Sequence, residues 1–146
     1  WWILQETGGI AALMEKQSLN FDSRADNIVI AEKLVDDVCK KFSVDEDYYG
    51  NILIAVTEAV NNAINHGNRQ NPDKKVHLEF VERADRLSFS VIDEGDGFDH
   101  EALPDPTDPE NLEKISGRGV FLMKHLADEV EFSQNGSKVE MIFKVA

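Results

Sequence analysis

The chain has 146 residues, and its 28 acidic and 15 basic side chains give a formal net charge of −13 at pH 7. The length fits one domain, and 42% hydrophobic residues with only 9 glycines and 4 prolines indicate a globular protein, neither disordered nor fibrous. So acidic a chain can scarcely supply the basic face that phosphate contacts need, which argues against a nucleic-acid-binding protein. The charge fits either a partner with a positive patch or solubility alone.

The single cysteine and the spacing of apolar residues bear on the cellular compartment. Cys39 cannot form an intramolecular disulfide, which fits a reducing cytoplasm, and it lies in a segment where we expect an inert core or boundary residue. No apolar run approaches the ~20 residues that a membrane span needs. The first residues also lack the basic region and long apolar stretch of a signal peptide. We therefore expect a cytoplasmic protein that does not bind a membrane.

The predicted elements begin with a short strand at residues 18–21. This strand opens a single domain that spans residues 18–146. We expect residues 1–17 to form an N-terminal extension, of native or artificial origin.

Two long helices are predicted next. Apolar residues at helical spacing predict the first over residues 26–42. Hydroxyl and carboxylate side chains at residues 43–46 are typical of a capped helix start. The second helix is then expected to run to about His66, and Gly67 with Asn68 forms its C-terminal stop.

From residue 75 onward the periodicity changes to that of strands. Alternating apolar residues predict strands over 76–80 and 87–91, joined by a turn, and a final hairpin is expected around Asn135 and Gly136. Residues 100–116 hold three of the four prolines and read as a long loop. The remaining predictions are a glycine-interrupted loop at 93–98, a third helix at 119–127, and strands at 130–132 and 139–145. The hairpins favour one α/β domain with a mostly antiparallel sheet and argue against a doubly wound parallel sheet.

The second predicted helix carries a dense polar cluster on the arc opposite its apolar face. Glu58 and Asn62 lie four residues apart and therefore point the same way. A carboxylate and an amide oxygen together suit Mg²⁺, which takes phosphate oxygens and waters as further ligands. The alternative is an asparagine-rich exposed helix end. The cluster also includes Asn61, Asn65 and His66.

Two glycine-containing turns are the other candidate binding segments. Asp93 ends a predicted strand and is followed by Gly95 and Gly97, so its carboxylate could accept from an amine while the glycines allow a ligand close to the backbone. Residues 116–119 read Ser-Gly-Arg-Gly and open a helix, which is a natural seat for phosphate. Taken alone, the first could be an ordinary turn and the second a tight loop-to-helix junction.

The order and spacing of the three segments resemble those of the GHKL ATPase superfamily, and within it the anti-sigma-factor serine kinases of bacterial partner-switching systems. The segment E-A-V-N-N-A-x-x-H at 58–66 is similar to the family's N-box, and D-E-G-D-G-F at 93–98 to its first glycine box. S-G-R-G-V-F-L-M at 116–123 is similar to the second, and Asp-Glu-Val at 128–130 to the anti-sigma branch. The resemblance covers roughly residues 18–146. It implies an α+β fold: a two-layer sandwich with a mostly antiparallel mixed sheet, covered on one face by helices.

The resemblance also implies roles for individual residues. Asn62 would bind Mg²⁺ that bridges the phosphates of ATP, and Glu58 would act as the general base toward an attacking serine hydroxyl. Asp93 would accept from the adenine amino group, and residues 99–116 would form a lid over the ATP. The other nucleotide-binding residues implied are Gly95, Gly97, Gly117, Arg118, Gly119 and Val120, with Asn61, Asn65, His66, Lys114 and Ser116 as secondary candidates.

The function implied is that of an ATP-dependent serine protein kinase and anti-sigma factor. Such a protein phosphorylates a small anti-sigma-antagonist protein of the STAS type and sequesters a sigma factor, without contacting nucleic acid itself, and family members often work as homodimers. One residue departs from the pattern. Ile115 stands where kinases of this branch can carry an arginine before the Ser-Gly of the second box. The alternative is therefore a nucleotide-binding switch that holds a partner protein without transferring phosphate.

Overall fold

A computed structural model of the protein describes residues 2–7, 10–95 and 115–145. The described strands form one six-stranded sheet in the order β1-β2-β3-β4-β6-β5, and every neighbouring pair is antiparallel. The strands are β1 Trp2–Thr7, β2 Ile10–Asp22, β3 Lys75–Arg83, β4 Arg86–Ile92, β5 Glu129–Ser133 and β6 Lys138–Lys144.

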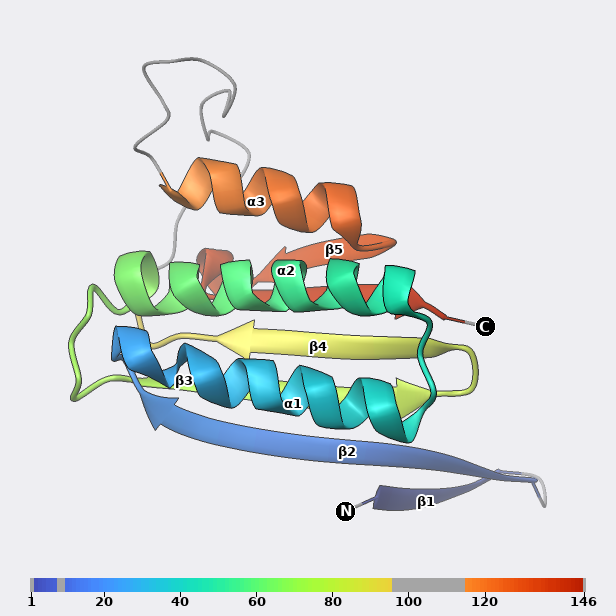
Figure 1. Cartoon of the computed structure of the whole chain (residues 1–146). Helices are drawn as coiled ribbons and strands as arrows, with labels where there is room; N and C mark the ends of the chain where they lie inside the picture. Colours follow the sequence, from blue (N-terminus) through green and yellow to red (C-terminus); the bar gives the residue numbers. More distant parts are fainter. Residues whose placement is uncertain (1, 8–9, 96–114, 146) are drawn as a thin grey trace.

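In the described part of the chain, three α-helices cover one face of this sheet, and the second in chain order lies between the first and the third (Figure 1). They are α1 Ile28–Lys41, α2 Glu46–Asn62 and α3 Ile115–Leu126. The α+β fold with helices on one face is confirmed. The sheet, expected to be mixed but mostly antiparallel, contains only antiparallel pairs in the part of the chain that the structure describes.

The core lies between the helices and the sheet. Val76, Leu78 and Phe80 alternate along β3 and are fully buried, as period-2 spacing predicts. Their neighbours on the next strands continue the same layer, and the rings of Phe80 and Phe89 lie 5.1 Å apart between centroids. Burying each such side chain contributes about 1.5–3 kcal/mol, so this layer fixes which face of the sheet receives the helices.

Some element boundaries differ from the predictions. β2 begins at Ile10 rather than at residue 18, and pairs with β1 on one side and β3 on the other. The pairing extends the strand through residues whose sequence shows no alternation. α2 starts after Asp45, whose carboxylate accepts from the backbone N–H of Asp47 at 3.3 Å, while Ser43 has a φ of 51° and stands outside the helix.

The C-terminal end of α2 also differs from a simple stop at Gly67. The α-helix ends at Asn62 and continues as a π-helical turn, η2 Ala63–Gly67. The N–H of Asn68 donates to the carbonyl of Ala63 at 2.8 Å, a bond that spans five residues and widens the turn. π-helical turns are rare and frequently lie at functional sites.

Two further predictions bear on the site. α3 begins at Ile115, earlier than the predicted residue 119, and residues 99–114 of the predicted lid lie outside the described residues. Cys39 is buried in α1, in the core, and burial raises the pKa of its thiol to about 11. Within the described residues, we find no helix with the length and apolar character needed to span a membrane.

Candidate nucleotide site

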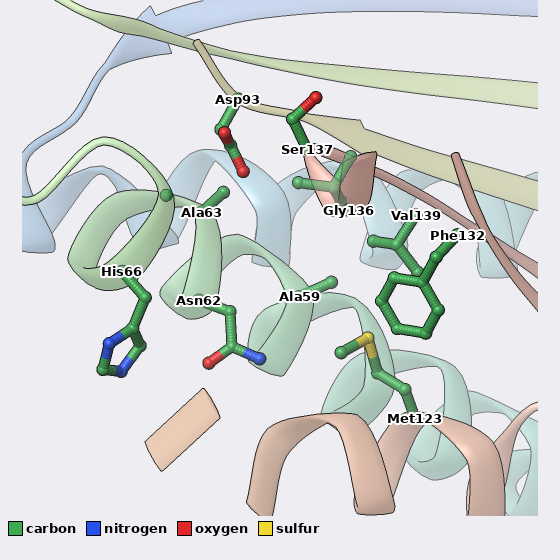
Figure 2. Close-up of a pocket in the computed structure, with 12 residues that line it drawn as sticks. Ala59, Asn62, Ala63, His66, Asp93, Met123, Phe132, Gly136, Ser137 and Val139 are labelled. Carbon is green, nitrogen blue, oxygen red and sulfur yellow. The ribbon is translucent and has the colours of Figure 1, made fainter. Parts of the chain in front are cut away.

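A small cavity lies where the C-terminal end of α2 meets the end of β4, the end of β5, the start of β6 and the second half of α3 (Figure 2). It encloses about 30 Å³, far less than the several hundred Å³ of a typical ligand pocket. One end is apolar and the other polar. Its lining consists of Ala59, Asn62, Ala63, His66, Gly67, Val91, Asp93, Met123, Phe132, Gly136, Ser137 and Val139.

Asn62 is the unusual member of this lining. Its side chain is only 8% exposed, and neither Oδ1 nor Nδ2 has a hydrogen-bond partner among the described residues. Buried polar atoms are almost always paired, and leaving one unpaired costs about 1–3 kcal/mol. In Figure 2 the amide points from α2 toward α3. An amide held in this way is suited to a ligand rather than to the fold.

Gly119 of α3 packs directly against the Asn62 amide. A Cβ built on Gly119 would overlap Nδ2 and lie 3.1 Å from Oδ1. A larger residue would therefore displace the amide, so the glycine here is required for close approach of α3 to α2. The polar arc of α2 and the second glycine segment, which lie far apart in the sequence, are thus brought together.

Asp93 reaches the cavity from the opposite side, at the end of β4 (Figure 2). The backbone N–H of Gly95 donates to its Oδ1 at 2.8 Å, and its own N–H donates to the carbonyl of Ser137 at 2.9 Å. Burial raises the pKa of the Asp93 carboxyl above its usual 3.8, and the hydrogen bond from Gly95 opposes that shift. The carboxylate is held by its neighbours and keeps capacity to accept from a ligand.

Gly67 is a site residue that the sequence analysis named only as a helix stop. A Cβ on Gly67 would overlap the Asp93 carboxylate, and a Cβ on Gly95 would overlap the carbonyl oxygen of Gly67. The π-helical turn brings Gly67 into this contact. No local sequence signal distinguishes such a glycine from an ordinary C-terminal stop.

Ser137 is a second lining residue that sequence reasoning missed. It follows the Asn135–Gly136 turn, which was recognised only as a hairpin signal. Its hydroxyl donates to the carbonyl of Gln134 at 2.8 Å, and its carbonyl holds the N–H of Asp93. The residue that directly precedes β6 therefore helps to anchor the end of β4.

The remaining polar residues of α2 and η2 have different surroundings. His66 is exposed and lines the cavity, whereas Glu58, Asn61 and Asn65 are half-buried and do not line it. Asn65 Oδ1 accepts from the side-chain amide of Gln70 at 2.9 Å. Glu58 lies one helical turn before Asn62 on α2, as expected for two residues that are four positions apart in a helix.

The second glycine segment is described only in part. The first turn of α3 contains Ser116, Gly117 and Arg118, whose side chains are not among those that the structure describes. Gly97 and Lys114 lie wholly outside the described residues. The side chain of Val120 is 4% exposed and belongs to the core. It can therefore contribute to a ligand site only through its backbone.

The donor set decides whether Mg²⁺ fits here. No group of three or more His, Cys, Asp or Glu residues that could hold a metal ion occurs in the described part of the chain. A cation held by protein carboxylates alone is thus not indicated by these residues. The orphaned Asn62 oxygen fits a different arrangement, in which one amide oxygen and phosphate oxygens share a hard cation that keeps its waters.

Comparison with known proteins assigns the chain to a family. Residues 21–143 match the family described as the histidine kinase-like ATPase domain. The chain belongs to this family.

Within the matched proteins, several relatives are named as anti-sigma factors or serine-protein kinases. The chain is 30% identical over 133 residues to the anti-sigma F factor of Clostridium beijerinckii, covering 88% of this chain and 92% of the relative. It is 25% identical over 128 residues to the serine-protein kinase RsbW of Oceanobacillus iheyensis (84% and 81%). For RsbW of Bacillus subtilis the identity is 33% over 108 residues (70% and 67%).

A solved structure shares the fold. It contains the RsbU and RsbW domains of Rv1364c from Mycobacterium tuberculosis, and it superposes with a TM-score of 0.64 at 14% sequence identity. The match covers 90% of this chain and 32% of that longer chain. At this identity the likeness supports the fold alone.

Proposed function

We propose that this protein is an ATP-dependent serine protein kinase and anti-sigma factor. The observation that carries the proposal is the buried Asn62 amide, which has no partner among the described residues and lies one helical turn after Glu58 in a histidine kinase-like ATPase domain. The names of the relatives, serine-protein kinase RsbW and anti-sigma F factor, support the same function.

The nucleotide would bind between α2, the end of β4 and the start of α3. Asn62 would hold Mg²⁺ through Oδ1, Asp93 would accept from the adenine amino group, and Gly95 and Gly97 would let the base approach. Gly117, Arg118 and Gly119 would cover the phosphates, with residues 99–116 as the lid. Because the cavity encloses only about 30 Å³, binding requires its walls to move apart.

In the transfer step, the oxygen of a serine hydroxyl on the partner protein bonds to the γ-phosphorus of ATP. The bond from that phosphorus to the β,γ-bridging oxygen breaks, and ADP leaves. Glu58 accepts the hydroxyl proton, and the helical spacing of α2 places it on the same side as Asn62. When bound, Mg²⁺ supplies neutralisation of the phosphate charge.

The partners proposed are an anti-sigma-antagonist protein of the STAS type, which receives the phosphate, and a sigma factor, which is sequestered. The net charge of −13 favours association with a basic protein such as a sigma factor and disfavours direct contact with nucleic acid. A homodimer acting in the cytoplasm completes the proposal.

Glu58→Gln tests the enzyme assignment. The protein is used to capture partners from its source lysate with Mg·ATP, and phosphorylation sites on every retained protein are mapped by mass spectrometry. We expect one small partner to gain a phosphoserine, and Glu58→Gln to slow that transfer by about 10²-fold or more while ATP binding persists. Glu32→Gln, an exposed glutamate on α1, is the matched control and should transfer normally. Retention of a partner without any new phosphate would contradict the kinase assignment and favour a nucleotide-binding switch that holds a partner protein without transferring phosphate.

A further inference from the structure

A second buried asparagine lies at the end of the π-helical turn, and its surroundings contrast with those of Asn62. Asn68 is 1% exposed and uses both ends of its amide. Nδ2 donates to the hydroxyl of Ser23 at 2.8 Å and to the carbonyl of Lys75 at 2.9 Å, while Oδ1 accepts from the backbone N–H of Glu94 at 2.8 Å. One side chain thus joins the ends of β2 and β4 and the start of β3.

These partners leave only one orientation of the amide. The Lys75 carbonyl can only accept a hydrogen bond, and the Glu94 N–H can only donate one, so Nδ2 and Oδ1 cannot exchange places. The bond to Glu94 is the one that concerns the nucleotide site, because Glu94 directly follows Asp93.

The end of β4 is therefore held from both sides of Asp93. On one side the N–H of Asp93 is bound to the carbonyl of Ser137, and on the other the N–H of Glu94 is bound to Asn68. Between these two points the carboxylate lies against Gly67 without room for a Cβ. The position of the carboxylate therefore depends on a side chain that does not itself line the cavity.

We infer that Asn68 is a positioning residue that sets the preference of the site for adenine nucleotides. By binding the N–H of Glu94, it keeps the Asp93 carboxylate where it accepts from the exocyclic amino group of adenine. The inference rests on the proposed function, since it assumes that Asp93 reads the base. Asn68 affects the base and not the phosphates, which are expected at the other end of the site, near Asn62 and Gly119.

The test compares ATP with inosine triphosphate, which has a carbonyl oxygen in place of the amino group. Calorimetric titrations with Mg²⁺ are made on the wild type, Asn68→Ala and the matched control Ser23→Ala. The control breaks the same cluster on the side away from Asp93 and leaves the Glu94 bond in place. We expect Asn68→Ala to lower the ratio of ATP to inosine triphosphate affinity by about tenfold, mainly through weaker ATP binding, and Ser23→Ala to keep the wild-type ratio.

The outcomes separate this inference from the proposed function. A wild type that binds neither nucleotide would overturn both. A wild type that binds ATP, with the same nucleotide ratio in all three proteins and lower melting temperatures in both variants, would reduce Asn68 to a stabilising residue and leave the proposed function intact. Should Asn68→Ala fail to fold, hydrogen exchange of the Glu94 amide in the wild type decides. Slow exchange supports the bond to Asn68, and exchange as fast as that of an exposed loop overturns it.

Discussion

The contrast between the two buried asparagines makes a prediction about stability without any ligand. Asn62→Ala removes an amide whose donor and acceptor have no partner among the described residues. An unpaired buried polar atom costs about 1–3 kcal/mol, while truncating a buried side chain of this size loses about 1 kcal/mol of packing. We therefore expect the free energy of unfolding to stay unchanged or to rise by up to about 2 kcal/mol.

Asn68→Ala is the matched comparison, because it removes a buried amide that is fully bonded. The bonds to Ser23, Lys75 and Glu94 are all lost, and each contributes about 1 kcal/mol net. We expect this variant to lose about 2–4 kcal/mol of stability, part of it from the Glu94 N–H left without its acceptor.

Urea unfolding followed by circular dichroism, without nucleotide and with a chelator present, measures both variants. With a slope of about 2 kcal/mol per molar urea, the two midpoints should differ by at least about 1 M. If Asn62→Ala is destabilised as much as Asn68→Ala, then Asn62 is a satisfied structural residue, and the reasoning that assigns its amide to a ligand is refuted.

Three further predictions concern single residues. Gly67→Ala pushes on the Asp93 carboxylate and should weaken ATP binding by about 10–100-fold in calorimetry, while Gly50→Ala, where a Cβ meets nothing within 4 Å, should bind normally. The pKa of the Asp93 carboxyl should lie above 3.8 in a carbon-13 NMR titration, and a value below 3.8 would contradict the burial argument. Because folding raises this pKa, the contribution of Asp93 to stability should fall as the pH rises from 3.8 to the pKa of the folded state. Cys39, with a pKa of about 11, should react with a thiol reagent at pH 8 only after unfolding, and rapid labelling of the folded protein would contradict its burial.

The sequence was sufficient for the elements whose residues repeat with a clear period. Alternation along residues 76–80 and 87–91 predicted two neighbouring strands, and helical spacing predicted α1 and most of α2. It was not sufficient for the extent of β2. Residues 10–17 show no alternation, and their strand conformation depends on pairing with β1 and β3, which is a tertiary effect.

The candidate site was predictable as a set of residues but not as an arrangement. Periodicity on α2 set Asn62 apart from the apolar face, and the glycines near Asp93 indicated close approach. Nothing local showed that Asn62 would be buried against Gly119, or that the helix would widen into a π-helical turn at residues 63–67. Such contacts arise from packing between distant segments, so they appear only in three dimensions.

Asn68 shows the same limit most clearly. In the sequence it follows a glycine, and the pair predicts only the C-terminal stop of a helix. Its importance comes from partners 45, 7 and 26 residues away, which converge only after the sheet has formed.

Titration calorimetry of Mg·ATP into the wild type and Asn62→Ala tests whether the Asn62 amide binds the nucleotide. We predict saturable binding of one nucleotide per chain to the wild type, and no detectable binding to a folded Asn62→Ala variant. Equal ATP affinity of the two proteins would contradict the assignment of Asn62, and with it the nucleotide site built around its unpaired amide.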